Sequence, residues 1–155
     1  MRRKSCRILT PPVRLLGFLD RFGKFGLPIQ TTEFDIDTND EPLQADYLRD
    51  YMTATFSHPA VSGFVLWGFW AGDHWIPHAA LFRRDWSIKP NGRVYQDLVF
   101  HKWWTNVQGQ TDARGQYATR GFLGDYQISA TANGKTVTVK TELPKAGRTL
   151  RLILQ

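Results

Sequence analysis

The chain has 155 residues, of which 42% are hydrophobic, and it carries a formal net charge of +6. This length suits one ordinary domain or two small ones, and the hydrophobic content supplies a core and argues against disorder. The excess basic residues lie in the segment 1–14, so the remainder is nearly neutral and lacks the basic stripe of a nucleic-acid-binding protein. We therefore expect no nucleic-acid partner.

The first fourteen residues are expected to form an irregular basic segment. They show no hydrophobic periodicity and contain Pro11-Pro12, and these prolines and Arg14 interrupt any secretory hydrophobic region. No apolar run approaches the length of a membrane span, so no membrane partner is expected and the localisation stays open. Cys6 is the one cysteine of the chain, which rules out an intrachain disulfide.

Two elements are predicted next along the chain. Apolar residues at helical spacing from Val13 predict a helix that ends near Gly23 or Gly26. The apolar run at about 28–34 predicts a strand buried on both faces, as in a parallel sheet.

A second helix is predicted after a polar loop, with Asp40 as its N-cap, Pro42 in its first turn and its end near Ser57. Its expected buried face consists of apolar residues at helical spacing: Leu43, Tyr47, Tyr51, Met52 and Phe56. A strand at 63–69 and a long loop at 70–90 follow.

A third helix is predicted from Pro90 or Asn91 to about 104, with Val94, Leu98 and Trp103 or Trp104 facing inward. The alternation of helices and strands predicts an α/β arrangement with parallel strands, at the spacing of a (β/α) barrel unit.

The segment 106–155 changes character and predicts a small antiparallel β module. Its Asn133-Gly134 pair is a strong hairpin signal. Short alternating strands are expected at 116–122, 126–131, 136–141 and 149–154. A module of this size is marginal alone, so we expect it to dock on the α/β part.

Carboxylates and indoles follow the two predicted strands. Glu33 lies near the end of the first strand, and Trp67 and Trp75 lie at or after the end of the second. A carboxylate can attack an anomeric carbon, and indole rings pack on the apolar faces of sugars, so this pattern indicates a sugar-cleaving site. The plainer alternatives are a surface carboxylate at position 33 and core tryptophans at 67 and 75.

A metal site at His74 and His78 is disfavoured, because Pro77 prevents a regular helix between them and no third ligand stands nearby. No metal and no cofactor are therefore expected.

A set of motifs in this region resembles the C-terminal part of glycoside hydrolase family 10, the retaining endo-β-1,4-xylanases with a (β/α)8 barrel. The motifs are Thr32-Glu33-Phe34-Asp35-Ile36, Trp67-Gly68, Trp75, Lys89-Pro90 and Tyr95. The resemblance implies that residues 15–105 are the last two βα units of such a barrel, and that 106–155 form the β module found after the barrel in some bacterial members.

The resemblance also implies roles for individual residues. Glu33 matches the catalytic nucleophile, Asp35 the acid that supports it, and Trp67 and Trp75 the indoles that enclose the sugar beside the cleaved bond. Xylan or xylo-oligosaccharides are then the expected partners.

The chain departs from the family pattern at two points. Ala71 stands where related members often have an acidic residue, and no Asn-Glu pair is present to supply the acid/base glutamate. We therefore expect a xylanase-like chain that is weak or inactive by itself. The alternative is a non-catalytic or vestigial xylan-binding fragment, with self-association through the open barrel edge as a further possibility.

Overall fold

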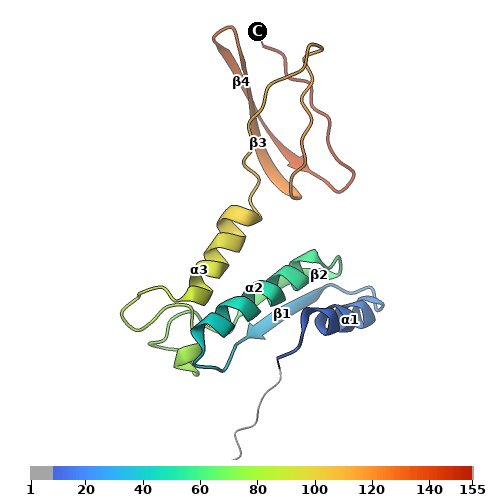
Figure 1. Ribbon diagram of the computed structural model, residues 1–155. Coiled ribbons are helices and arrows are strands. Elements are labelled where there is room, and N and C mark those ends of the chain that lie inside the picture. Colours follow the sequence, from blue (N-terminus) through green and yellow to red (C-terminus); the bar gives the residue numbers. More distant parts are fainter. Residues whose placement is uncertain (1–8, 155) are drawn as a thin grey trace, which may run out of the picture. The chain divides into compact units, whose positions relative to one another are not determined.

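The computed structural model describes residues 9–154, which form two compact units, 9–100 and 101–154. The first unit contains helix α1 (Pro12–Gly23), strand β1 (Ile29–Phe34), helix α2 (Glu41–Ser57), strand β2 (Val61–Leu66) and helix α3 (Pro90–Asp97) (Figure 1). A 3-10 turn η1 (Pro77–Ala79) lies in the loop before α3, and a π-helical turn η2 (Leu98–Lys102) extends α3.

The helices begin where the sequence predicted. Helix α1 starts at Pro12, which corrects the expectation of an irregular segment as far as residue 14, and ends at Gly23 as expected. The carboxylate of Asp40 accepts a hydrogen bond from Leu43 N at 3.0 Å, which confirms the predicted cap of α2.

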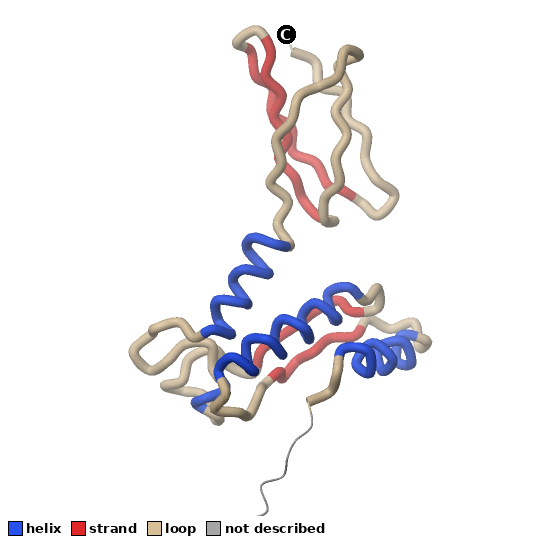
Figure 2. Tube along the Cα trace, in the orientation of Figure 1, coloured by secondary structure: helices blue, strands red, loops and turns tan. Residues whose placement is uncertain are grey.

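Strands β1 and β2 form a parallel pair, as predicted, with Ile29 opposite Val61 and Phe34 opposite Leu66. Strand β2 covers 61–66, two residues earlier at its start than predicted and three earlier at its end. The tube view in Figure 2 shows α2 running along one side of the pair, with loops at the strand ends that lead into α2 and α3. No third strand joins this pair among residues 9–154.

The core lies between the strand pair and its helices. Leu15 and Leu19 of α1 pack with Ala54 of α2. Phe34 lies 4.5 Å from Tyr51 and 5.2 Å from Phe64 between ring centroids, so one face of the sheet is covered by α2.

Two predicted burial patterns are wrong. Strand β1 is not buried on both faces, because the side chains of Thr32 and Glu33 are exposed. In α2 the predicted apolar face is rotated: Leu43 and Phe56 are exposed, while Gln44 is fully buried. The reason is that α2 packs against α3 and α1 as well as the sheet, so the buried stripe follows Gln44, Leu48 and Thr55.

The second unit is a hairpin with long irregular segments. Strands β3 (Gly124–Ala132) and β4 (Lys135–Leu143) pair antiparallel around Asn133 (φ 50°) and Gly134 (φ 75°), which confirms the predicted turn. The predicted strands at 116–122 and 149–154 are wrong, since these described residues form no regular strand. An alternating pattern alone does not make a strand, because a strand is stabilised by pairing and packing with its neighbours.

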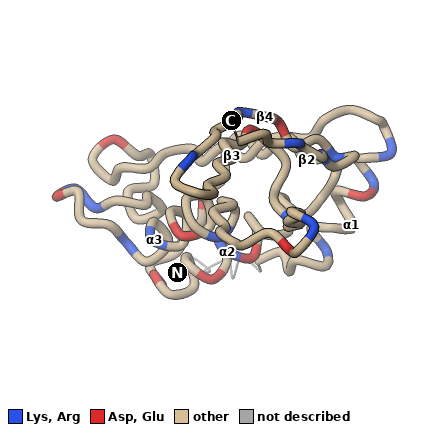
Figure 3. Tube along the Cα trace, turned by 90° about the horizontal axis from the view of Figure 1, so that it is seen from above, with Lys and Arg blue, Asp and Glu red and all other residues tan. Residues whose placement is uncertain are grey.

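Helix α3 ends at Asp97 and continues as η2 to Lys102, close to the predicted end at about 104. Leu98 is buried as expected, whereas Trp104 is exposed. Within residues 9–154, no helix combines the length and the apolar character that a membrane crossing requires. Basic and acidic positions are interspersed along the trace and no element carries a continuous basic stripe (Figure 3).

Candidate functional site

Glu33 and Trp67 lie at the same edge of the sheet. Glu33 is the penultimate residue of β1, and Trp67 directly follows the last residue of β2. Trp67 N donates to Phe34 O at 3.3 Å, so the backbone pairing between β1 and β2 extends to Trp67. Because the strands are parallel, their carboxyl ends form one rim, the place where α/β proteins bind ligands.

The Glu33 side chain faces away from the packed side of the sheet. Phe34 is buried against α2, whereas Glu33 and its neighbour Thr32 are both exposed, at a point where the register between β1 and β2 shifts. Among residues 9–154 the Glu33 carboxylate has no hydrogen-bond or ion-pair partner. It is therefore an exposed and chemically available carboxylate.

Asp35 is held by two partners from the loop after β2. Its Oδ2 accepts a hydrogen bond from Trp75 Nε1 at 2.7 Å. Its Oδ1 lies 3.0 Å from His74 Nε2, a distance suited to an ion pair but at an angle outside hydrogen-bond geometry. The structure thus brings Asp35 and Trp75 together. The sequence did not predict the contact between His74 and Asp35, although the position of His74 directly before Trp75 could have suggested it.

The two indoles of the predicted site are largely open. Trp67 is 50% exposed and Trp75 is 70% exposed, so neither is a core residue. No ring contact joins them among the described residues. The Trp75 indole is held by its hydrogen bond to Asp35. Trp67 is held through its backbone, which bonds to Phe34 O next to the end of β2.

A glycine makes the contact of His74 possible. A methyl group at Gly68 would lie 2.6 Å from His74 Cδ2, closer than van der Waals contact allows. Gly68→Ala is therefore expected to lower the free energy of unfolding by about 1–3 kcal/mol, because a buried ring must move. Urea unfolding would measure this.

Gly17→Ala is the matched control, because nothing lies within 4 Å of its added methyl in α1. Alanine is the better helix former there, so this variant should be as stable as wild type or slightly more so. Equal stability of the two alanine variants would contradict the steric account of Gly68.

Four side-chain pairs join the segment 35–44 to the segment 74–89, and we call them the polar ladder. They are Asp35–His74, Asp37–His78, Glu41–Arg83 and Gln44–Lys89. The pairs follow one another in the same order along both segments. They fix the loop that carries Trp75 to the segment that follows Glu33.

Gln44 and Lys89 form the buried end of the polar ladder. Gln44 is 0% exposed, and its Nε2 donates to Ile36 O, Thr38 O and His78 O at 3.1, 2.7 and 2.8 Å. Lys89 Nζ donates to Gln44 Oε1 and to His78 O, both at 2.6 Å. Sequence reasoning missed Gln44, because a glutamine within a helix carries no local sign of burial.

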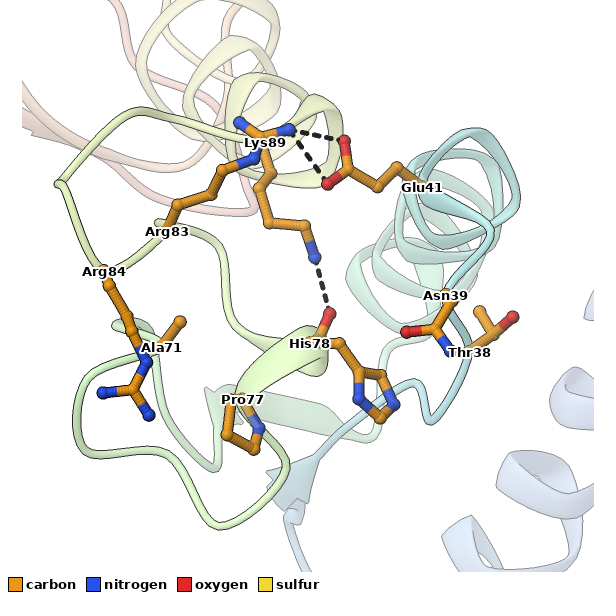
Figure 4. A pocket seen from close by; sticks show the side chains of 9 residues that line it. All are labelled: Thr38, Asn39, Glu41, Ala71, Pro77, His78, Arg83, Arg84 and Lys89. Carbon is orange, nitrogen blue, oxygen red and sulfur yellow. Dashed lines mark hydrogen bonds and ion pairs between the residues drawn. The ribbon is translucent and has the colours of Figure 1, made fainter.

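A pocket of about 150 Å³ lies beside Lys89. In Figure 4 the Lys89 ammonium reaches the carbonyl of His78, and the Arg83 guanidinium meets the Glu41 carboxylate. Burial lowers the pKa of Lys89 below its ordinary value. Glu41 offsets part of this shift in pKa, and Arg83 adds to it.

The lowered pKa of Lys89 gives a pH-dependent contribution to stability. Between the lowered pKa and the ordinary value the unfolded chain binds more protons, so stability rises with pH in that window. Wild type is expected to gain stability relative to Lys89→Met as the pH rises from neutral to about 10.

Urea unfolding at several pH values would measure this difference, with the exposed Lys140→Met as a control that should show no such trend. A difference between wild type and Lys89→Met that stays constant or falls with pH would contradict the account.

An aromatic stack closes the same loop. Trp70 and Trp86 are stacked with ring centroids 5.0 Å apart and planes at 10°. Trp86 has a φ of 65°, which is strained for a residue with a side chain. The Trp70 indole also donates to Arg84 O at 3.3 Å. The stack and this hydrogen bond therefore hold the two ends of the segment 70–86 together.

Within residues 9–154 no group of His, Cys, Asp or Glu side chains could hold a metal ion. His74 and His78 contact different carboxylates, Asp35 and Asp37.

Comparison with known proteins identifies the family. The sequence profile described as Glycosyl hydrolase family 10 matches residues 8–97. The chain belongs to glycosyl hydrolase family 10. The match spans the first unit, and residues 98–155 lie outside it.

Relatives of this family 10 chain include xylanases and an anti-sigma-I factor. The anti-sigma-I factor RsgI6 of Acetivibrio thermocellus is 40% identical over 122 residues, covering 78% of this chain and 16% of that protein. Endo-1,4-beta-xylanase 1 of Arabidopsis thaliana is 32% identical over 123 residues, covering 79% of this chain and 13% of that protein. The family 10 chain thus spans less than a fifth of the length of these relatives.

Solved structures agree with the family. Xylanase 10B of Thermotoga maritima matches with a TM-score of 0.54 and 25% identity, over 60% of this chain and 33% of that chain. Xylanase 10B of Thermotoga petrophila RKU-1, solved in complex with xylobiose, matches with a TM-score of 0.53 over the same shares. The resemblance to xylanases expected from the sequence is confirmed.

Proposed function

We propose that this chain provides the nucleophile side of a retaining site that cleaves β-1,4-xylan. The observation that carries the proposal is the Glu33 carboxylate, which is exposed, without a partner among residues 9–154, and placed at the rim where β1 ends. Trp67 and Trp75 stand at the same rim as platforms for xylosyl rings. The xylobiose complex of a related xylanase supports the choice of substrate.

The proposed reaction is a double displacement. Glu33 attacks the anomeric carbon of a xylosyl unit, and the C1–O bond to the leaving sugar breaks. A second carboxyl group protonates the leaving oxygen, and it then activates the water that releases the glycosyl ester. We assign this second group to polypeptide other than residues 1–155, because this sequence contains no Asn-Glu pair.

The same proposal treats the first unit as two consecutive βα units of a (β/α)8 barrel. The parallel register of β1 and β2 supports it, together with the partial match to the xylanase structures. A cleft of about 700 Å³ runs beside β2 and α3, and apolar side chains such as Val65, Phe69 and Phe100 line it. The cleft and the exposed apolar residues are the surfaces that neighbouring barrel units would cover.

A substrate with an activated leaving group tests Glu33 in the chain alone. A 2-deoxy-2-fluoroxylobioside of 2,4-dinitrophenol loses its phenolate without protonation, so the acid group is not needed. The expected result is one fluoroxylobiosyl ester per chain, located on Glu33 by peptide mass spectrometry. An ester on another residue, or no ester at concentrations where xylobiose binds, would refute the nucleophile role.

A second candidate is a protein that binds xylan without cutting it. The exposed indoles favour it, and so does the relationship to an anti-sigma-I factor, a protein named for regulation. Electrophoresis in a xylan-containing gel tests it. Retardation that is lost in Trp75→Ala and kept in Trp104→Ala, an exposed indole of the second unit, would support binding at the proposed site. Unretarded wild type would reject the binding role.

A further inference from the structure

His74 is a buried titratable side chain that the proposed reaction does not use. Its side chain is 0% exposed, and that of Asp35 is 14% exposed. The loop between β2 and α3 places His74 directly before Trp75, and Gly68 leaves the room that the ring occupies. Among the described residues, His74 Nε2 is a buried side-chain nitrogen with no hydrogen bond in proper geometry, and the Asp35 carboxylate lies beside it.

Hydrogen bonding fixes the tautomer of His74. Ile76 N donates to His74 Nδ1 at 2.9 Å, so Nδ1 carries a lone pair and the neutral ring bears its proton on Nε2. The polar group near Nε2 is Asp35 Oδ1 at 3.0 Å. The proton therefore lies on the nitrogen beside the Asp35 carboxylate.

Asp35 links this buried imidazole to an exposed indole. With Oδ1 beside His74, the carboxylate presents Oδ2 to Trp75 Nε1 at 2.7 Å. Trp75 is 70% exposed and has little packing to hold it, so this charge-assisted hydrogen bond sets the direction of its ring. If the carboxylate rotated, the indole would lose that restraint.

We propose that His74 is a positioning residue. It holds the Asp35 carboxylate so that the Trp75 indole stands at the rim beside Glu33, as a wall for the pyranose ring next to the cleaved bond. The proposal rests on the proposed function for the identity of the sugar. The relay from His74 through Asp35 to Trp75 stands on the contacts themselves.

The alternative use of His74 is metal binding, with His78 four residues later. The contacts oppose it, because His74 contacts Asp35 and His78 contacts Asp37, which are two separate pairs of the polar ladder. The described part of the chain offers no third ligand for either histidine.

Nuclear magnetic resonance of the full chain tests the relay without any activity. In wild type the ¹⁵N shifts of His74 should report a proton on Nε2, and a proton on Nδ1 would overturn the proposal with no variant needed. The indole proton of Trp75, assigned with Trp75→Phe, should lie downfield because it is bonded to a carboxylate. Asp35→Ala gives its position without that bond.

Two variants of His74 separate positioning from space filling. His74→Leu removes the donor and should move the Trp75 indole proton most of the way to its position in Asp35→Ala. His74→Gln keeps an N–H group near the place of Nε2 and should leave the resonance close to wild type. An unmoved Trp75 resonance in His74→Leu would overturn the relay. So would an equal displacement of all six indole resonances, which reports general loosening.

Binding of xylobiose completes the test. Fluorescence titration should give affinity about tenfold weaker for His74→Leu than for wild type, since the Trp75 indole would no longer be held in the direction that meets the sugar. His74→Gln should recover most of the affinity. Failure of wild type to bind xylobiose would count against the proposed function, whereas the indole resonance would still decide the relay.

Discussion

Glu33→Gln is expected to abolish formation of the fluoroxylobiosyl ester. The amide is isosteric with the carboxylate but lacks the charge and nucleophilicity needed to attack the anomeric carbon. Loss of an activated nucleophile lowers the rate of a covalent step by about 10³–10⁶-fold. Stopped-flow release of dinitrophenolate would measure the rate, and intact-mass spectrometry would count the esters.

The matched control is Glu142→Gln. Glu142 is an exposed carboxylate on β4, in the second unit, and the substitution makes the same change of charge. It should leave the rate unchanged. Since Glu33 has no ion-pair or hydrogen-bond partner among residues 9–154, Glu33→Gln should also unfold at the urea concentration of wild type. Ester formation by Glu33→Gln at the wild-type rate would remove Glu33 from the mechanism.

Gln44→Ala is expected to be strongly destabilising, although the residue it removes is polar. It leaves Thr38 O without the amide donor, takes one acceptor from Lys89 Nζ, and opens a cavity. Ile36 O loses the amide but keeps the bond from Thr38 N at 3.0 Å. Each orphaned buried polar group costs about 1–3 kcal/mol. The free energy of unfolding in urea should fall by about 2–4 kcal/mol.

Two variants show which half of the Gln44 amide matters. Gln44→Glu keeps an oxygen for Lys89 but turns the donor that faces Ile36 O and Thr38 O into an acceptor. A loss similar to that of Gln44→Ala would assign the effect to the donors. Gln96→Ala, an exposed glutamine of α3, is the control and should change stability by less than about 0.5 kcal/mol. Equal stability of Gln44→Ala and Gln96→Ala would show that the buried amide is not needed.

Local signals predicted much of the fold. Asp40 ahead of Pro42 marked the start of α2, Asn133-Gly134 marked the hairpin, and the apolar run before Glu33 marked β1. Each signal lies within a few residues, where backbone preference and capping decide the structure. The end of β2 was predicted too late because aromatic residues continue from Trp67 onward, beyond the last residue that pairs with β1. Aromatic content does not distinguish a strand from the loop after it.

The candidate site was predicted in part, for a related reason. Glu33 and Asp35 stand at the end of β1, and that strand end can be read from the sequence. Trp75 lies in the loop after β2 and was found through its motif. Gln44 and Lys89 are polar residues whose burial depends on each other across 45 positions of the chain. Nothing local marks such a pair, because each residue alone resembles a solvated surface residue.

The polar ladder has a consequence for how this chain can vary. Loops that join strands to helices ordinarily accept insertions and deletions. Here the loop before α3 is tied at four points, through His74, His78, Arg83 and Lys89, to the segment that follows β1. An added residue between two of these points would have to bulge outward for the pairs on both sides of it to remain. The length of this loop is thus constrained between its tied points, in a part of the molecule where length is usually free.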